Sequence, residues 1–477
     1  MKRYKKLGLL LAVLAFACTA TFALSHYEQK KEEIQTSDAV VLSLPAGEVT
    51  ALSWLEQNGS GLTFHKEGET WKYDEDAAFP VNQEKIQNIL SHFENFGVTF
   101  QISQVEDYGQ YGLDAPQATI HLDTRDASYD IRLGDFSKMD QQRYVDLGDG
   151  NVYLVREDPL DIVEEDLSAM IQNDEIPQIQ TITAIELSGS QEETIRYIPD
   201  SGLSYSEEDV YFTLDSLPLD TQKVDTLQNT IRSLDLSSYA SYNATPQELA
   251  DCGLDTPELT IQLTYTPEED TQEQTLLLQI GRDPQALQAA AQAEEGEEVD
   301  IPAYIRIGDS QILYHLSDSA YQTLSASGYN DLRHKALFYA DFSDVTQMDI
   351  TLEGTTHTLL ARQKEAGDAT WHYPESLREA DSEEKADTPE VDISALRQAL
   401  YALDIETFTQ EAPTGKEELR MVLYLNNSAF PTTELTLYRL DGVNCQAELN
   451  GTPIGRLPRS QVVTLIESVQ AIVLSSQ

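Results

Sequence analysis

The sequence predicts an α+β fold, in which an N-terminal transmembrane helix precedes repeated units of antiparallel meander sheet packed with a helix. Three observations predict it. An uncharged apolar run near the N-terminus follows a basic cluster, a short phrase recurs before strand-like segments, and helical apolar stripes lie upstream of each copy. Together they indicate a tethered chain of repeated globular units.

The apolar run extends from Leu7 to Leu24 and holds 18 residues without a charge, enough to cross a bilayer with slight adjustment. Residues 1–6 form a basic tail, which predicts a cytoplasmic N-terminus and a single pass through the cell membrane. The bulk of the chain is then extracytoplasmic. Residues 25–40 are polar and charged, and we interpret them as a stalk.

Three fates of this run stay open, and all three place the remaining chain outside the cytoplasm. The run can be retained as a signal anchor, which we favour, or cleaved after small residues such as Ala17 or Ala23. It can also be cleaved and lipidated at Cys18. The preceding residues resemble a bacterial lipobox only loosely, because no Leu stands three residues before the cysteine.

The charge balance is strongly acidic, with 82 Asp and Glu against 31 Lys and Arg and a net charge of −51. Such a surface repels phosphate backbones, so we expect no nucleic-acid partner. Cys252 and Cys445 are far apart and lack the CxxC spacing of a metal or redox site. We favour two buried thiols over a disulfide between them.

The repeated phrase is Gly-Leu-Asp-x-Pro, and each copy leads to an apolar strand that ends in Gly134 or Gly281. We predict one repeat over 41–175 and a second over 178–337. Residues 340–477 lack the phrase but keep the other features, so we interpret them as a degenerate third repeat. The phrase itself consists of Gly112, Leu113, Asp114 and Pro116 in the first copy and Gly253, Leu254, Asp255 and Pro257 in the second.

Within each repeat the pattern predicts three strands, a helix, a meander of four strands and a short helix. Asn82, Asp220 and Asp392 each precede a helical stripe and are suitable N-caps. The stripes consist of Ile86, Ile89, Leu90, Phe93 and Phe96; Val224, Leu227, Ile231 and Leu234; and Ile393, Leu396, Leu400 and Leu403. One stripe per helix predicts packing against a sheet.

We interpret the phrase as a structural turn. Glycine permits positive φ, leucine fills the core, aspartate bonds to nearby backbone amides, and proline extends the residue before it. The alternative makes Asp114 and Asp255 ligands or acids. We favour the turn, because no histidine or second acid recurs at a fixed spacing beside both.

The search for chemistry yields no catalytic, cofactor or metal residues. Phosphate-loop, dinucleotide, zinc and nucleophile-elbow patterns do not occur in the sequence. Acidic clusters at Glu268–Asp270 and Glu294–Asp300 could bind Ca²⁺, but solvated charge is the favoured interpretation. Two acidic inserts, Ala286–Val299 and Glu375–Glu390, are predicted as surface loops.

The N-terminal anchor, the Trp71-Lys-Tyr73 segment and the two Gly-Leu-Asp-x-Pro phrases resemble the DUF4340 family, a bacterial domain of unknown function. The resemblance covers about residues 45–340. Cys252 replaces the aromatic residue that usually precedes the phrase. The resemblance implies a membrane-tethered, extracytoplasmic protein with an accessory role beside an ABC-type transport system, and it supplies no catalytic residues.

The leading hypothesis is a membrane-tethered interaction or scaffold protein, not an enzyme, with a protein partner in a transport or envelope complex. A ligand-binding ectodomain for glycan, peptide or Ca²⁺ is the alternative, and an uncharacterised hydrolase is the third.

Overall fold

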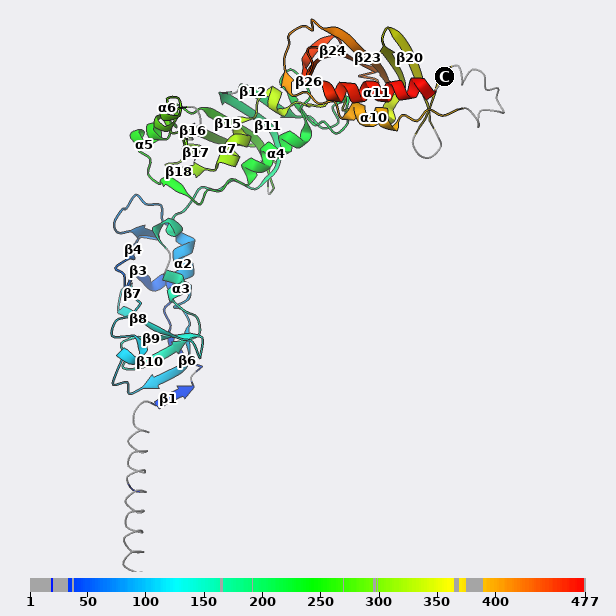
Figure 1. The fold of residues 1–477 in the computed structure, drawn as a ribbon. Coiled ribbons are helices and arrows are strands. Elements are labelled where there is room, and N and C mark those ends of the chain that lie inside the picture. The colour runs from blue at the N-terminus through cyan, green and yellow to red at the C-terminus, as the bar shows by residue number, and fades with distance from the viewer. Residues whose placement is uncertain are drawn as a thin grey trace, which may run out of the picture. The chain divides into compact units, whose positions relative to one another are not determined.

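The computed structural model describes residues 33–36, 38–163, 166–190, 192–268, 270–294, 297, 299–363, 369–374 and 389–475, together with Thr19 (Figure 1). The predicted anchor and Cys18 lie outside these ranges, Thr19 excepted. Among the described residues, no helix has the length and apolar character needed to cross a membrane.

Three antiparallel sheets share one strand order. The first runs β6 (Phe96–Ser103), β10 (Val152–Val155), β9 (Gln142–Asp146), β8 (Ser128–Ser137), β7 (Ala118–Thr124), β3 (Val49–Glu56), β4 (Gly61–Glu67), β5 (Thr70–Tyr73). The second runs β14 (Tyr239–Ser241), β18 (Leu313–Leu316), β17 (Ala303–Ile307), β16 (Gln274–Arg282), β15 (Leu259–Pro267), β11 (Ile179–Gly189), β12 (Glu193–Tyr197), β13 (Tyr211–Thr213). The third runs β22 (Thr407–Phe408), β26 (Thr452–Pro458), β25 (Asn444–Leu449), β24 (Thr432–Arg439), β23 (Lys416–Leu425), β19 (Val345–Leu352), β20 (Thr355–Arg362), β21 (Thr370–His372).

This common order confirms the predicted α+β class with antiparallel sheets. The predicted four-strand meander is present in each repeat, as β7 to β10 in the first. One strand per repeat was not predicted, namely β6, β14 and β22. Each follows the main helix and pairs with the last strand of the meander; β14 and β22 form the edge of their sheets, whereas β6 is followed by β1 (Glu33–Thr36). The third repeat has this topology although it lacks the Gly-Leu-Asp-x-Pro phrase.

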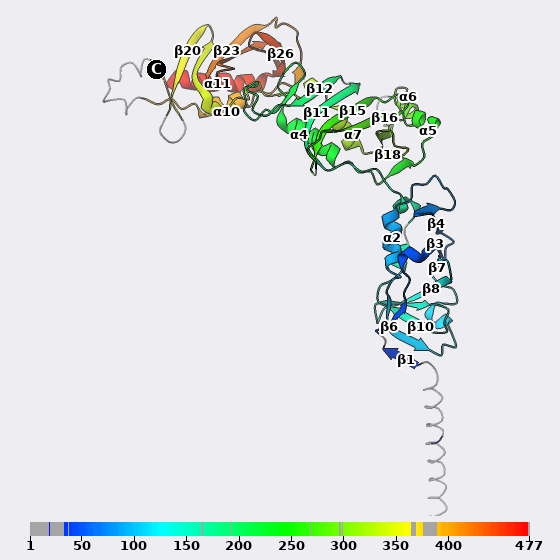
Figure 2. The same cartoon turned by 180° about the vertical axis from the view of Figure 1, so that it is seen from behind.

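The helices pack by the predicted stripes. The main helices are α2 (Gln83–Ser91), α4 (Thr221–Arg232) and α10 (Ser394–Tyr401), and almost all of the predicted apolar residues are buried. The Asn82 side chain caps α2 and the Asp220 side chain caps α4, as predicted. α7 (Asp318–Ser325) packs beside α4, and α11 (Arg459–Ser475) packs beside α10 (Figures 1 and 2).

Shorter helical segments connect the remaining elements. They are η1 (Ala46–Glu48), η2 (Gly109–Tyr111), α3 (Leu160–Val163), η3 (Leu167–Met170), α5 (Pro246–Asp251), α6 (Pro284–Ala290), α8 (Tyr329–Leu332) and η4 (Phe342–Asp344). α6 corrects the predicted loop at Ala286–Val299, because the Asp283 carboxylate caps a helix there. The insert Glu375–Glu390 lies outside the described residues except for its last two positions.

The predicted stalk at 25–40 is also corrected. β1 (Glu33–Thr36) and β2 (Val40–Leu42) both pair with β6, so the described part of this segment belongs to the first sheet. The mostly polar composition of β1 hid that strand, because backbone pairing at a sheet edge needs no apolar side chains.

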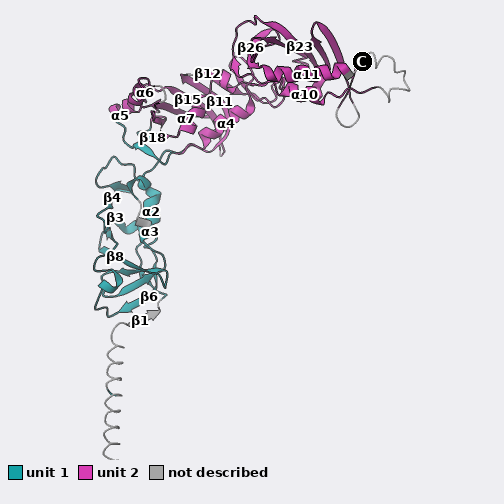
Figure 3. Ribbon diagram, viewed as in Figure 1, with its two compact units in different colours: residues 1–175, 236–245, 310–314 teal, residues 176–235, 246–309, 315–477 magenta. Residues whose placement is uncertain are grey.

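The chain divides into two compact units (Figure 3). Unit 1 contains residues 1–175, 236–245 and 310–314, and unit 2 contains the rest, including the third sheet. Within unit 1 the Tyr242 hydroxyl donates to Asp76 (2.8 Å), and its ring lies 5.0 Å from that of Phe79. The repeat boundaries at 41–175, 178–337 and 340–477 stay predictions.

Candidate functional site

The first Gly-Leu-Asp-x-Pro phrase ends a helical turn. Gly112 has φ +69°, and its N–H donates to the carbonyl of Gly109 (3.1 Å). The Leu113 N–H reaches back to the carbonyl of Tyr108 (3.1 Å). These two bonds form a Schellman motif, in which a left-handed glycine closes the helix. The turn therefore stops η2 and directs the chain into β7.

The second phrase repeats this geometry at the end of α5. Gly253 has φ +66°, and its N–H donates to the carbonyl of Ala250 (3.1 Å). The Leu254 N–H donates to the carbonyl of Leu249 (2.7 Å). Leu113 and Leu254 are 2% and 3% exposed, so each fills the core as predicted. The helical turn before the phrase was missed, because a single turn has no periodicity to detect.

The predicted role of the two aspartates is wrong. Asp114 and Asp255 are exposed, and among the described contacts neither carboxylate accepts a backbone N–H. Asp255 accepts only the hydroxyl of its neighbour Thr256 (3.3 Å). Asp114 borders a shallow hollow with Arg132. Nothing in the structure explains the choice of Asp at this position.

The glycine that ends the following strand belongs to the same device. A Cβ on Gly134 would lie 2.2 Å from the carbonyl oxygen of Tyr111. A Cβ on Gly281 would lie 2.4 Å from that of Gly253 and 2.6 Å from that of Cys252. Only glycine lets the turn pack this closely on the neighbouring strand.

An arginine holds the residue that follows each turn, a contact that the sequence analysis did not find. In the first repeat Arg143 is buried and donates to Gln117 Oε1 (2.8 Å), Asp158 Oδ1 (2.6 Å) and the carbonyl of Gly134 (2.6 Å). Its side chain is 7% exposed and that of Asp158 is 13% exposed. The guanidinium therefore ties the turn, the strand and the end of the meander together.

The second and third repeats place a carboxylate at the same register. Arg282 binds Glu258 through two bonds (2.7 and 3.0 Å), and Arg459 binds Glu418 (3.1 Å). Tyr321 adds a hydroxyl bond to Glu258 (3.1 Å) and presents its ring to Arg282. Because these partners come from distant parts of the chain, no local pattern indicates them.

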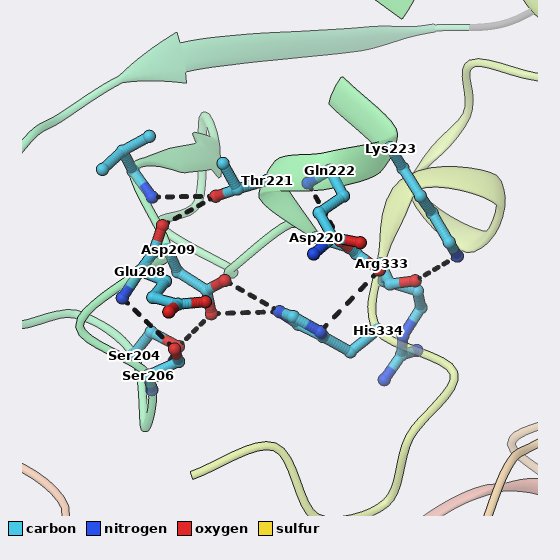
Figure 4. A network of polar contacts seen from close by, with 11 residues as sticks. Ser204, Ser206, Glu208, Asp209, Asp220, Thr221, Gln222, Lys223, Arg333 and His334 are labelled. Carbon is cyan, nitrogen blue, oxygen red and sulfur yellow. Dashed lines mark hydrogen bonds and ion pairs between the residues drawn. The ribbon is translucent and has the colours of Figure 1, made fainter. Parts of the chain in front are cut away.

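The most connected polar cluster lies inside unit 2 (Figure 4). The Asp209 carboxylate is 2% exposed and accepts the Ser204 hydroxyl (2.5 Å). His334 Nε2 lies 2.9 Å from Asp209 Oδ1, and its Nδ1 lies 4.0 Å from Asp220 Oδ2. Lys223 extends the cluster on the neighbouring turn of α4. We call Ser204, Asp209, Asp220, Lys223 and His334 the junction cluster.

Lys223 anchors the segment that carries His334. Its ammonium donates to the carbonyls of Asp331 (3.0 Å) and Arg333 (2.7 Å). Burial lowers the pKa of Lys223, and the nearby Asp220 opposes that shift. The ammonium thus serves as a backbone clamp on the segment between the second and third sheets.

Aromatic rings continue the junction toward the third sheet. Tyr339 stacks on His334 with centroids 4.1 Å apart and planes 5° apart. Burial raises the pKa of Tyr339, and the charge of Asp209 adds to that shift. Tyr205 contacts Phe430 of the third repeat (4.7 Å) and accepts a hydrogen bond from the Asn450 amide (2.6 Å).

Arg333 lies between two rings, 4.7 Å from the centroid of Tyr329 and 4.5 Å from that of Phe408. Each such contact stabilises a packed cation by about 0.5–1 kcal/mol or more. Tyr329 precedes the segment and Phe408 belongs to β22, so Arg333 links the second repeat to the third.

The order of groups in the junction cluster argues against hydrolysis. In a hydrolytic triad the imidazole bridges the hydroxyl and the carboxylate. Here the Asp209 carboxylate bridges Ser204 and His334, so the hydroxyl proton is directed to Asp209 rather than to a base that could activate it. The arrangement instead fixes the loop before β13 to the segment after α8.

The cysteines and acidic clusters form no reactive centre in the described part of the chain. Cys252 and Cys445 are free and buried, as predicted, and burial raises the pKa of their thiols to about 11 and about 12. Neither is a thiolate at neutral pH, so neither is a ready nucleophile. Within the described residues, no group of three His, Cys, Asp or Glu side chains could hold a metal ion.

Comparison with known families gives one match. Residues 71–202 and 213–421, well over half of the chain, match a family described as Domain of unknown function (DUF4340). The chain belongs to the DUF4340 family. The second matched stretch runs through β19 into β23, so the family similarity extends into the third repeat. No curated protein and no solved structure matches the chain.

Proposed function

We propose that this DUF4340 protein is a membrane-tethered, extracytoplasmic interaction or scaffold module that serves an ABC-type transport or envelope complex and catalyses no reaction itself. The junction cluster is the observation that carries the proposal. Its polar groups fix the end of the second repeat to the loop before β13. The neighbouring side chains of Tyr205 and Arg333 then contact the third repeat, within unit 2.

Such a junction suits a scaffold for an energetic reason. Detaching the segment after α8 from the loop before β13 would leave the Asp209 carboxylate and the His334 ring without each other, and a buried charge that loses its partner costs about 3–5 kcal/mol. Separating the second repeat from the third would break the aromatic contacts of Tyr205 and Arg333. A body that resists separation can hold two binding faces at a constant spacing.

The charge of −51 adds a constraint on partners. An acidic surface is repelled by anionic lipid headgroups, so attachment to the membrane is expected through residues 7–24 and not through the folded repeats. The same field favours neutral or basic protein surfaces as partners.

Affinity capture tests the proposal. The full chain, tagged at its C-terminus, is crosslinked in cells and purified from solubilised membranes. We expect a defined set of transporter or envelope proteins. The control is the same tagged protein beginning at residue 25, exported through a cleavable leader, which should lose the membrane-dependent part of that set.

Failure to recover a specific partner under crosslinking would contradict the proposal. Turnover of ester, peptide or glycan substrates by the purified chain, abolished by His334→Gln, would contradict its non-enzymatic part and favour the hydrolase hypothesis.

A further inference from the structure

In the first repeat, the turn between the edge strand β5 and α2 holds a tyrosine side chain that comes from the next repeat. The Tyr242 hydroxyl donates to Asp76 Oδ2 (2.8 Å), and this bond raises the pKa of Tyr242 to about 12. The Tyr242 ring lies edge-on to the ring of Phe79, with centroids 5.0 Å apart, and Phe79 is 2% exposed. All three residues belong to unit 1. An apolar side chain and a nearby carboxylate therefore bind the two ends of one tyrosine.

The turn between β13 and α4 is the counterpart in the second repeat. Leu217 stands three residues before the cap of α4, as Phe79 stands three residues before the cap of α2, and a proline follows each of them. Asp215 supplies a carboxylate within this turn, as Asp76 does in the first repeat. The second repeat therefore has both kinds of group that hold Tyr242 in the first.

The two turns differ in what covers them. In the second repeat Leu217 is 44% exposed, and Leu214 at the start of the same turn is 59% exposed. Asp215 is exposed as well, and among the described residues its carboxylate has no partner. The described chain therefore covers the turn of the first repeat and leaves the turn of the second accessible.

Hydrogen bonds hold the turn of the second repeat in a fixed shape. The Thr213 N–H donates to the carbonyl of Leu217 (2.9 Å), and the Ser216 N–H donates to the carbonyl of Thr213 (3.0 Å). The Thr213 hydroxyl accepts the Leu217 N–H (3.1 Å). Ser216 has φ +63°, a conformation that residues other than glycine adopt only where the surrounding structure imposes it. A turn fixed in this way can present its leucines and Asp215 to a partner with little loss of conformational entropy on binding.

We propose that residues 214–217, the second-repeat turn, bind a tyrosine side chain of a partner protein. The ring lies on Leu214 and Leu217, and the hydroxyl donates to Asp215, as Tyr242 donates to a carboxylate in the first repeat. Tyrosine suits such a contact, because its large ring is buried while its hydroxyl keeps a polar partner. The net charge of −51 favours a neutral or basic segment around that tyrosine. The inference rests on the proposed function and names the chemistry of one contact with the partner.

A peptide with the sequence of residues 239–245 (YASYNAT), whose second tyrosine is Tyr242, provides the probe. It is titrated onto the full chain in detergent, with isotope-labelled leucine methyl groups and their NMR chemical shifts as the readout. We expect saturable shifts of the Leu214 and Leu217 methyl groups, because a tyrosine ring shifts the resonances of groups that lie on its face. Replacing the second tyrosine of the peptide by alanine should abolish these shifts. Replacing it by phenylalanine should weaken binding about fivefold, because the hydrogen bond to Asp215 is lost.

Each change has a matched control. In the peptide, replacing the first tyrosine by alanine should leave binding unchanged. In the protein, Leu217→Asp should weaken binding at least about tenfold, because apolar contact area is lost. Val443→Asp makes the same kind of change in the turn between β24 and β25, where Val443 is 72% exposed, and should leave binding unchanged. No saturable shift, equal loss on replacing either tyrosine, or equal weakening by both protein substitutions would overturn the proposal.

Crosslinked capture from cells separates this inference from the proposed function. If Leu217→Asp loses one captured protein that Val443→Asp retains, and replacing a tyrosine of that protein by alanine also prevents its capture, the proposal for the second-repeat turn is supported. If both variants capture the same set, if the lost protein needs none of its tyrosines, or if it is a second copy of the chain, that proposal fails while the scaffold function stands. If the unmodified chain captures no partner, the scaffold function fails and the proposal for the turn fails with it.

Discussion

The first two repeats and the third reach the same strand order with different turns. In the first two, a Schellman turn with a left-handed glycine packs on the glycine that ends the next strand. In the third, Tyr438 occupies that strand position and pairs with Glu417, because β23 begins earlier, at Lys416. The close approach moves to Gly415, whose Cβ would meet the Arg439 carbonyl.

This difference shows that Gly-Leu-Asp-x-Pro acts together with a second feature, the glycine at the end of the next strand. The turn glycine and the strand glycine occur together in the first two repeats and are replaced together in the third. The sheet topology does not depend on the device, since the third repeat forms the same sheet without it. What the repeats have in common is a polar residue at this register, Gln117, Glu258 or Glu418, which is bound by an arginine from a different element in each repeat.

The largest effect is expected where this arginine is most buried. Arg143→Ala leaves the Asp158 carboxylate in a partly buried site without its partner, so the free energy of unfolding should fall by about 4 kcal/mol. Arg459→Ala in the third repeat should cost only about 1 kcal/mol, because that side chain is 29% exposed and donates a hydrogen bond of 3.1 Å to Glu418. Urea denaturation of both variants measures the contrast, and equal losses would contradict the ranking by burial.

The second-largest effect is expected from disturbing the contact between the turn glycine and the strand glycine. Gly281→Ala places a methyl group against two carbonyl oxygens, which forces the backbone to shift and should lower the free energy of unfolding by about 3 kcal/mol. Gly442→Ala in the third repeat is the control, since its Cβ would meet no atom within 4 Å. It should change stability by less than about 0.5 kcal/mol. A tolerated Gly281→Ala would show that the turn and the strand are not coupled.

The junction cluster should respond less strongly. Asp209→Ala removes the acceptor of Ser204 and the partner of His334, and we expect a loss of about 2 kcal/mol in the free energy of unfolding. Hydrogen exchange should rise on both sides of the junction, in the loop before β13 and in the segment after α8. Glu208→Ala, an exposed neighbour, is the control. Faster exchange confined to one side would contradict the role of Asp209 as the link between the loop before β13 and the segment after α8.

The sequence predicted the parts of this molecule whose causes are local. Apolar spacing gave the main helices, and Asn82 and Asp220 marked their first turns because a cap needs only the next few residues. The positive φ of Gly112 and Gly253 followed from the turn they occupy. The family resemblance was carried by the same short phrases.

The missed features all depend on residues that are distant in the chain. β6, β14 and β22 are paired by register with strands about 50 to 75 residues later. β14 and β22 are too short to show an alternation, whereas β6 does alternate apolar residues, and assigning Phe96 to the helical stripe hid that pattern. Ser204 and His334 meet at Asp209 only after the end of the second repeat has packed on the loop before β13, although His334 lies 125 residues after Asp209. The role given to Asp114 failed for another reason, since a residue suited to capping need not find a free N–H.

The smallest expected effect is a pH dependence confined to the first sheet. The hydrogen bond between His121 Nδ1 and Asp130 (2.7 Å) raises the pKa of His121, and Asp123 adds to that shift. The folded state therefore binds the proton more tightly, so the stabilisation is complete below about pH 6.5 and is lost as the pH rises through the folded-state pKa. Because the His121 side chain is 40% exposed, solvent screens the pair, and the gain in the free energy of unfolding should stay below about 0.5 kcal/mol.

His121→Gln should then be slightly less stable than the parent at pH 5.5 and equal to it at pH 9, by urea denaturation. His357→Gln in the third sheet serves as the control, and a deficit of His121→Gln that persists at pH 9 would assign the effect to packing rather than to the proton.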